Sequence, residues 1–298
     1  MKVTVTGASG FIGRRLVRRL LEANHSVHLL VRSPRAGLGA VPWSLWDALA
    51  GDPPAASLEG VEALIHLAGE PIAQRWTPVV KERILRSRVE GTARLVAALA
   101  RLERRPLVLV CASAVGFYGS RGDEVLTEES PPGSGFLSQV CMGWEEAADA
   151  AVELGIRVVK LRFGVVLGTE GGALARMLPP FRWGLGGCVG SGVQWMSWIH
   201  VDDLVELVCF SLEQAQFSGV ANATAPNPVR NAEFTATLAG GLRRPAFVPV
   251  PALVLKALFG EMAEILLGSQ RVLPRAAESA GFRFRYPHLE AALRQLLG

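Results

Sequence analysis

The chain has 298 residues and a formal net charge of +4, and half of its residues are apolar. This length supports one large domain or two small ones with a real core. The charge is mild and no lysine or arginine run is present, so the composition does not favour a nucleic-acid partner. A basic cleft for a phosphorylated small molecule would suit the same balance.

Four cysteines are spread along the chain with no CxxC pair: Cys111, Cys141, Cys188 and Cys209. They predict neither a disulfide framework nor a metal site, and buried free thiols are the simpler interpretation. No apolar run reaches the roughly 18 to 20 residues that a membrane span needs. Because the chain enters a strand directly after Met1, we expect a cytoplasmic protein, with the mitochondrial matrix or the nucleus left open.

The first two-thirds of the chain alternates between strand and helix patterns. Short apolar runs predict strands at 3–6, 27–31, 63–67, 107–111 and 157–161, and apolar residues at helical spacing predict helices at 11–23, 78–103 and 139–154. This alternation is typical of a parallel sheet covered on both faces. We therefore predict an α/β fold, a Rossmann doubly wound sheet with a ligand at the carboxyl ends of its strands.

The pattern changes after residue 167. A glycine-rich stretch is followed by a strand running into a helix at 197–212, an apolar helix at 252–267, a one-sided strand at 282–286 and a helix at 289–297. We predict a nucleotide-binding domain from 1–167 and 196–225. Segments 168–195 and 226–298 are predicted to form a smaller, discontinuous α+β lid over the ligand, with the apolar helix in its core.

The strongest motif is the glycine loop directly after the first strand. It reads Thr6-Gly7-Ala8-Ser9-Gly10-Phe11-Ile12-Gly13. The first glycine allows a tight turn, the second lets the backbone approach a pyrophosphate, and the third lets the helix pack closely on the strand. The helix N-terminus directs positive charge at the phosphates. The spacing is G-x-x-G-x-x-G, and its position between a strand and a helix supports dinucleotide binding.

The end of the second strand indicates which dinucleotide. An NAD-binding protein is expected to carry Asp or Glu about 20 residues beyond the loop, for the ribose hydroxyls. This chain has Val31, Arg32 and Ser33 there, with Arg35 just beyond. A guanidinium at Arg32 can hold a 2′-phosphate and stack on adenine. The sequence therefore favours NADP(H), unless Arg32 is only a solvated strand end.

Together with later segments, these residues resemble the extended short-chain dehydrogenase/epimerase family, and within it the atypical epimerase-like branch of class 39U. The resemblance rests on His66-Leu67-Ala68-Gly69-Glu70-Pro71-Ile72, on SAVGFYG from Ser113, on LRFGVVLG from Leu161, on SWIHVDD from Ser197 and on the ending VLPRAAESAGFRFRYP. It implies an NADP(H)-linked oxidoreductase or epimerase. It also implies that Leu67, Ala68, Gly69, Glu70, Arg162 and Phe163 contact the cofactor.

One departure from that family concerns its chemistry. The family uses a Tyr-x-x-x-Lys pair, in which the lysine lowers the pKa of the acid/base tyrosine and holds the nicotinamide ribose. No such pair exists in this chain, and Leu137 and Cys141 stand where it would fall. The usual acid/base group is absent.

Ser113 and Tyr118 are the remaining candidates for catalysis. Ser113 stands where the catalytic serine of the family would lie, or it is a strand-end serine that bonds backbone. Tyr118 is a substitute acid or a core tyrosine. Lys160 and His200 are weaker candidates, with a snorkelling and a structural role as their alternatives.

Other residues of the second part are expected to be structural. Asp202 and Asp203 are expected to cap the following helix. Trp183, Trp195 and Trp198 line the cleft only if the substrate is flat or apolar, and otherwise belong to the core.

Three functions agree with the sequence. The first is an NADP(H)-dependent oxidoreductase or epimerase that acts on a small carbonyl, alcohol or sugar-like substrate. The second is a sensor that binds NADP(H) without turnover, and the third is an interaction protein that retains only the fold. A homodimer through the long helices is possible.

Overall fold

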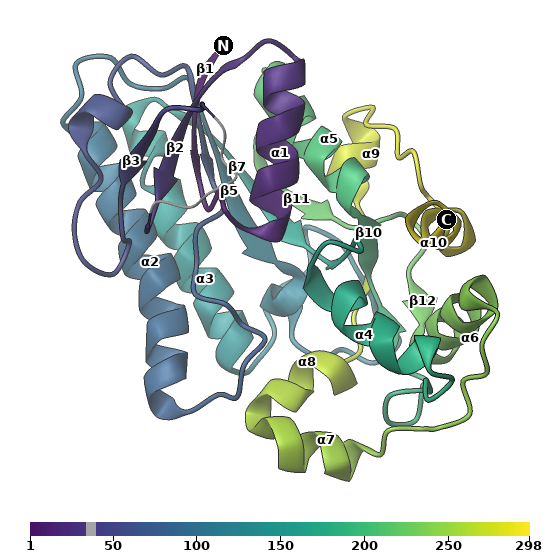
Figure 1. Cartoon of the computed structure of the whole chain (residues 1–298). Coiled ribbons are helices and arrows are strands. Elements are labelled where there is room, and N and C mark those ends of the chain that lie inside the picture. The colour runs from purple at the N-terminus through teal and green to yellow at the C-terminus, as the bar shows by residue number, and fades with distance from the viewer. Residues whose placement is uncertain (34–39) are drawn as a thin grey trace.

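A seven-stranded sheet runs through the computed structural model, which describes residues 1–33 and 40–298 (Figure 1). Every strand pair in this sheet is parallel. In sheet order the strands are β11 (Gly219–Ala223), β7 (Arg157–Phe163), β5 (Val108–Ala114), β4 (Ala63–His66), β1 (Lys2–Thr6), β2 (Ser26–Val31) and β3 (Trp43–Leu45). The order reverses between β1 and β4, so the predicted doubly wound Rossmann fold is confirmed.

Helices cover both faces of this sheet, which is why its strands are almost continuously apolar. Helices α1 (Phe11–Glu22) and α5 (Val201–Glu213) pack on one face against residues such as Val3 and Val5. Helices α2 (Pro78–Ala100) and α3 (Phe136–Asp149) pack on the other, against Leu64 and Leu109. These two helix layers hold β1 and β4 in place, and the order of the sheet reverses between these two strands.

A second core lies beyond the sheet, among the teal, green and yellow elements of Figure 1. Helices α4 (Gly172–Arg182), α6 (Asn231–Leu242) and α10 (Leu289–Leu297) supply residues to this core. Helix α9 (Arg275–Ser279) instead packs on the sheet core through Ala277, and α7 (Ala252–Phe259) and α8 (Ala263–Leu267) contribute no residue to the second core. The strand pairs β8 (Val165–Leu167) with β10 (Trp198–His200) and β9 (Trp195–Met196) with β12 (Val229–Arg230) accompany these helices. The pair β6 (Val125–Leu126) with β13 (Arg271–Val272) belongs to a separate small cluster that contains Tyr118. The core combines Leu167 and Trp198 with Leu178 and Leu293, which lie on opposite sides of the predicted domain boundary. That boundary stays a prediction.

The apolar segment 252–267 is not one helix buried in a lid, as the sequence predicts. Gly260 has a φ of 60° and ends α7, and a 3₁₀ turn then leads into α8. Leu255 is buried, whereas Leu253 is 79% and Leu258 60% exposed. Only a narrow stripe of this segment reaches the core, so the interpretation as lid core was wrong for most of its residues.

The predicted strand at 282–286 is also wrong, because no ladder forms there. The alternation is real as burial: Tyr286 is buried, Phe282 and Phe284 are half-buried, and the ring of Phe282 lies 5.4 Å from that of Phe210 on α5. The alternation of apolar and polar residues in this segment therefore reflects packing against a helix, and it needs no neighbouring strand. In the described part of the chain, no helix combines the length and apolarity that crossing a membrane requires.

Candidate functional site

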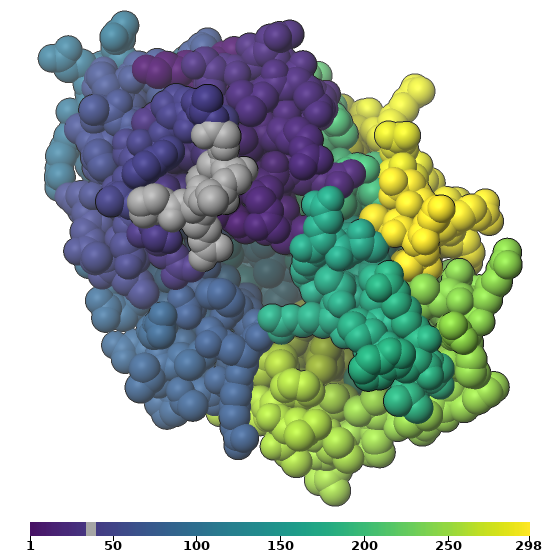
Figure 2. Space-filling view, in the orientation of Figure 1, coloured from purple at the N-terminus to yellow at the C-terminus, as the bar shows by residue number. Residues whose placement is uncertain are grey.

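The candidate site lies where β1 and β4 end, at the reversal of the strand order. The glycine loop follows β1, and the Leu67–Glu70 turn follows β4. A pocket of about 290 Å³ opens between them, lined by Gly7, Ser9 and Gly10 on one side and by Leu67, Gly69 and Glu70 on the other. Figure 2 shows the surface hollowed where the purple N-terminal part, the blue α2 and the teal α4 meet. Ligands of open parallel sheets bind at this position.

Backbone contacts explain two of the three glycines in the loop. Gly7 has a φ of 71°, and a Cβ there would lie 2.7 Å from the carbonyl carbon of Leu67. A Cβ at Gly13 would lie 2.3 Å from the Gly7 oxygen. Both neighbours are backbone, so they cannot move aside cheaply. Only glycine fits at these two positions. Gly7 lets the loop pack closely against the turn after β4, and Gly13 lets the helix pack closely against the loop.

The N-terminus of α1 is open toward the pocket. Gly10 is its N-cap residue and has no side chain to accept from the first helical N–H groups, and the first turn contains no acidic residue. The backbone N–H groups at Phe11 and Ile12 therefore keep their capacity for an anion. The ring of Phe11 packs elsewhere, against Gly168 and Gly171, where a Cβ would lie 2.3 Å and 2.9 Å from the nearest ring atom.

A buried polar line ties the two loops together. Thr6 Oγ1 accepts hydrogen bonds from the backbone N–H groups of Leu67 and Ala68 and contacts Nδ1 of His66 at 2.7 Å. Since both lone pairs of that oxygen are used, its proton goes to Nδ1, and Nε2 of His66 donates to Thr92 at 3.0 Å. Burial lowers the pKa of His66 to about 3. A neutral imidazole therefore satisfies the hydrogen bonds of His66 with Thr6 and with Thr92.

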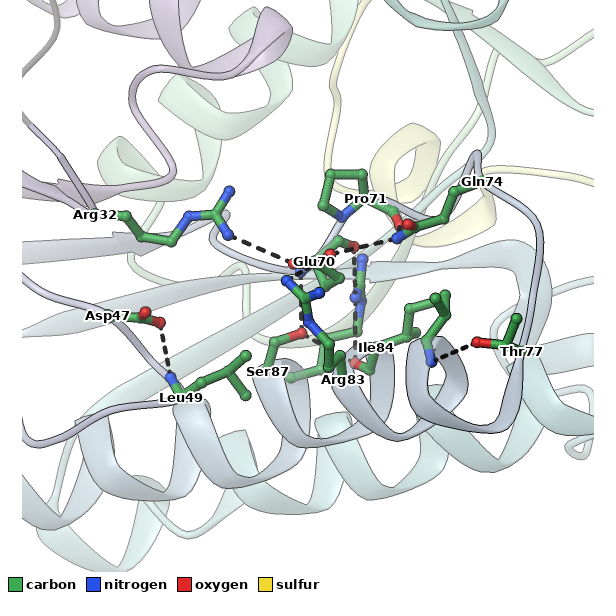
Figure 3. Close-up of polar contacts among 12 residues, drawn as sticks. Arg32, Asp47, Leu49, Glu70, Pro71, Gln74, Thr77, Arg83, Ile84 and Ser87 are labelled. Atoms are coloured by element: carbon green, nitrogen blue, oxygen red, sulfur yellow. Dashed lines mark hydrogen bonds and ion pairs between the residues drawn. The ribbon is translucent and has the colours of Figure 1, made fainter.

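Two arginines meet one carboxylate at the outer end of the pocket, as Figure 3 shows. Glu70 is nearly buried, and its oxygens lie 3.5 Å from Nη1 of Arg32 at the end of β2 and 3.2 Å from Nη2 of Arg83 on α2. Val31 and Arg32 line the pocket, while Ser33 is exposed beside it. Arg35 lies outside the described residues. The two guanidinium groups gather positive charge where a 2′-phosphate is predicted.

Arg162 takes part in a buried network below this edge, not in the pocket lining. It forms a two-pronged ion pair with Glu145 on α3, both contacts at 2.8 Å, and stacks on Phe117 with its Cζ 3.4 Å from the ring centroid. Ser113 donates to Glu145 at 2.6 Å. Phe163, the next residue, is half-buried and packs against the cores on both faces of the sheet.

Tyr118 is fully buried beside this network. Its hydroxyl donates to Asn222 at 2.7 Å and accepts from Arg162 at 2.9 Å, and burial raises the pKa of the phenol. The hydroxyl is already hydrogen-bonded to Asn222 and Arg162, which agrees with the alternative that Tyr118 is a core tyrosine. Ser113 is also buried, so its contact with a substrate stays a prediction.

The weaker candidates have structural partners. Lys160 donates to Asp149 at 2.5 Å. His200 has the structural role expected of it, because its Nδ1 accepts from the backbone N–H of Asp202 at 3.0 Å and so caps α5. The prediction that the aspartates cap this helix was wrong. Asp202 pairs with Arg15, and Asp203 accepts from the backbone N–H groups of Arg285 and Tyr286.

The three tryptophans do not form one wall. Trp198 is fully buried and Trp183 is 78% exposed. The ring centroid of Trp195 lies 4.5 Å from Cζ of Arg230 and 4.5 Å from Cζ of Arg271. They give no support to a flat aromatic substrate pocket. Among the described residues, no group of three or more His, Cys, Asp or Glu is placed to hold a metal ion.

Helix α2 contributes residues to the site that the sequence did not predict. Arg83 pairs with Glu70, and Ser87 lines the pocket and accepts from the Glu70 backbone N–H at 3.0 Å. A third residue, Arg88, donates to the Glu70 carbonyl. The spacing of Arg83 and Ser87 by four residues places both on one helix face, which is the signal that could have marked them. The same residue types are ordinary on an exposed helix, so the signal is weak.

Comparison with known proteins identifies the family. Residues 3–223 match the NAD dependent epimerase/dehydratase family, and residues 250–296 match a domain of unknown function, DUF1731. The chain belongs to the NAD dependent epimerase/dehydratase family. This confirms the family resemblance deduced from the glycine loop and the later motifs.

Full-length relatives agree with this membership. The chain is 44% identical over 310 residues to the chloroplastic homologue of epimerase family protein SDR39U1 from Arabidopsis thaliana, covering 100% of this chain and 87% of that protein. It is 38% identical to epimerase family protein YfhF of Bacillus subtilis, covering 100% and 98%. The crystal structure of human epimerase family protein SDR39U1 with NADPH superposes with a TM-score of 0.89 at 37% identity, covering 100% of this chain and 99% of that one.

Proposed function

We propose that this protein binds NADP(H) at the glycine loop and is an oxidoreductase or epimerase for a small carbonyl, alcohol or sugar-like substrate. The observation that carries the proposal is the packing of Gly7 and Gly13, which keeps side chains out of a space beside an open helix N-terminus. A dinucleotide pyrophosphate fits such a cradle, because it needs N–H donors and close backbone approach. The human relative was crystallised with NADPH.

The residues present fit the rest of the cofactor. Arg32 and Arg83 offer two guanidinium groups for the 2′-phosphate, and Glu70 holds both of them at the rim of the pocket. Leu67, Ala68 and Gly69 form the opposing wall. Two arginines on one phosphate give charge-assisted hydrogen bonds that a cofactor without this phosphate cannot form. The preference for NADP(H) over NAD(H) follows.

The bound cofactor would supply the hydride donor or acceptor, and the chain would orient the reactants. Ser113 is the residue of the described network that we assign to the substrate oxygen. Glu145 holds its hydroxyl, and Arg162 in turn holds Glu145 from β7. In this proposal, Arg162 and Phe163 lie below the nicotinamide half of the site and hold its residues in position.

A sensor that binds NADP(H) without turnover is the second candidate. Two observations favour it: Leu137 and Cys141 occupy the positions of the Tyr-x-x-x-Lys pair, and the Tyr118 hydroxyl is already bonded to Arg162 and Asn222. An enzyme and a sensor share the same cofactor site. The enzyme and the sensor differ in whether Ser113 takes part in turnover of a substrate as well as in binding.

The first experiment is a thermal-shift and fluorescence titration with NADPH and with NADH. A ligand that binds only the folded chain stabilises it by about 2.7 kcal/mol at 100 times its dissociation constant. We expect NADPH to raise the melting temperature at concentrations where NADH has no effect. An equal response to both would refute the 2′-phosphate assignment, and no response to either would leave only an interaction protein on this fold.

A second experiment separates enzyme from sensor. Oxidation of NADPH is followed with a panel of aldehydes, ketones and nucleotide sugars, for the wild-type chain and for Ser113→Ala. Loss of turnover with unchanged NADPH affinity in Ser113→Ala supports the enzyme. If the wild-type chain oxidises NADPH with none of the panel while binding it tightly, the sensor is favoured.

A further inference from the structure

Arg88 is a buried cation without a carboxylate partner in the part of the chain that the structure describes. Its side chain leaves α2 and is enclosed, with 8% of the residue exposed. Nη1 donates to the carbonyl oxygens of Glu70 at 3.0 Å and Ile84 at 3.3 Å. Nε is buried and has no hydrogen-bond partner among the described residues. A guanidinium has five donors, and among the described residues only Nη1 of Arg88 has hydrogen-bond acceptors.

This arrangement opposes stability. Burial lowers the pKa of Arg88 to about 10, so the group is still protonated at neutral pH. A desolvated charge with only neutral acceptors destabilises the fold unless a further acceptor joins it. Because Nε of Arg88 has no acceptor among the described residues, an acceptor supplied by a bound ligand would satisfy it.

The position of Arg88 shows where such an acceptor would lie. One face of its guanidinium packs on Gly69, where a Cβ would come within 3.0 Å of Cζ. Gly69 and the neighbouring Ser87 both line the pocket at the sheet edge. A substituted residue at position 69 would force the guanidinium to move. The cation therefore lies directly beneath the turn that faces the candidate cofactor.

Arg88 also lies beside Trp144 and Cys141 on α3. Its Cζ lies 5.0 Å from the ring centroid of Trp144, and its charge acts on the Cys141 thiol, whose pKa burial raises to about 11. Cys141 occupies the position of the lysine in the missing Tyr-x-x-x-Lys pair. A positive charge is thus present beside that position, but it comes from α2.

We propose that Arg88 takes over the cofactor-holding role of the missing lysine, donating from α2 to the ribose or phosphate oxygens on the nicotinamide side of NADP(H). This inference rests on the proposed cofactor. It assigns Arg88 as a cofactor-binding residue and Gly69 as the small residue that gives it room. In the family, one lysine both holds the nicotinamide ribose and lowers the pKa of the catalytic tyrosine. Arg88 is assigned only the first of these two roles.

The test compares two ligands on three proteins. NADPH contains the nicotinamide riboside, whereas adenosine 2′,5′-bisphosphate retains the 2′-phosphate and lacks that half. We expect Arg88→Met to weaken NADPH about ten-fold or more, as loss of a charge-assisted hydrogen bond predicts, and the bisphosphate less than about two-fold. Arg88→Lys retains the charge and should fall between the wild type and Arg88→Met.

The ligand-free melting temperature provides a readout that does not depend on the cofactor. Because Arg88 is desolvated without a counter-ion, Arg88→Met should melt at or above the wild-type temperature while binding NADPH less well. Equal weakening of both ligands, or unchanged NADPH affinity, overturns the proposal. If Arg88→Met does not fold, Arg88→Lys carries the same comparison. Failure of the wild-type chain to bind either ligand refutes the proposed cofactor instead.

Discussion

Arg162 and Glu145 meet as a two-pronged ion pair inside the protein, with Nε to Oε1 and Nη2 to Oε2 both at 2.8 Å. The arginine comes from β7 and the glutamate from α3, so the pair joins the sheet to the helix that covers it. Ser113 and Tyr118 each bond to one member of the pair. The two catalytic candidates are therefore connected through Arg162, which the family resemblance assigned to the cofactor, and through Glu145, for which the sequence predicted no role.

The first prediction concerns the stability of this ion pair. Removing one partner leaves an uncompensated buried charge, so Arg162→Met and Glu145→Gln should each lower the free energy of unfolding by about 3 to 5 kcal/mol. The double variant should lose less than the sum of the two, by about 1 kcal/mol or more, because neither charge is then stranded. Urea unfolding of the four proteins measures this coupling. Strict additivity would contradict the mutual dependence.

A second prediction concerns the glycine cradle. Gly13→Ala places a Cβ 2.3 Å from the Gly7 oxygen, so the loop must shift. We expect a loss of about 1 to 3 kcal/mol of stability, typical of overpacking, together with weaker NADPH binding. Gly51→Ala is the matched control, since nothing lies within 4 Å of a Cβ there. Thermal melting with and without NADPH compares them, and equal behaviour of the two variants would show that the close packing is unimportant.

The third prediction concerns pH. The unfolded His66 imidazole takes up a proton below its ordinary pKa of 6.5, whereas burial holds the pKa of the folded group at about 3. Between these values the unfolded chain binds more protons, so stability falls as the pH falls, by up to about 1.4 kcal/mol per pH unit. The loss begins near pH 6.5 and ends near pH 3.

His66→Asn isolates this contribution. Asparagine keeps an acceptor for Thr6 but does not titrate, so the variant should be less stable at neutral pH and depend less on pH between about pH 6 and pH 4. Denaturant unfolding at several pH values gives the two slopes. Parallel slopes would show that His66 does not carry the acid sensitivity.

Residues close in sequence account for what could be predicted of the site. The glycine loop connects a strand to a helix within eight residues, so its geometry follows from local order, and Gly7 and Gly13 lie where the motif requires. Arg32 was found because the end of β2 lies a fixed distance from that loop. Contacts of this kind need no knowledge of the tertiary fold.

The remaining contacts join segments far apart. Glu145 and Arg162 are 17 residues apart, and Tyr118 and Asn222 are 104 apart, so nothing local indicates that they meet. Resemblance to a family placed Arg162 near the cofactor but not its partner. Composition likewise predicted burial for segment 252–267, whereas Gly260 divides it and leaves one leucine-rich face in solvent.

The fourth prediction tests that exposed face. Leu253 is 79% exposed and Leu255 is 5% exposed on the same short helix. Leu253→Ala should therefore change the free energy of unfolding by less than about 0.5 kcal/mol, while Leu255→Ala should cost about 2 to 5 kcal/mol. Both substitutions remove the same atoms, so helix propensity cancels. Equal costs in urea unfolding would mean that Leu253 is covered in solution.

The last prediction concerns cofactor choice. Arg32 and Arg83 meet at Glu70, so a 2′-phosphate bound there can receive hydrogen bonds from both. Arg32→Gln and Arg83→Gln should each weaken NADPH about ten-fold and change NADH by less than about two-fold, because only NADPH carries the phosphate. Arg86→Gln, which removes a charge from the same helix where Arg86 pairs with Glu90, is the control and should alter neither ligand. Calorimetric titration gives both constants, and an unchanged ratio of NADPH to NADH affinity in Arg32→Gln and Arg83→Gln would place the phosphate site elsewhere.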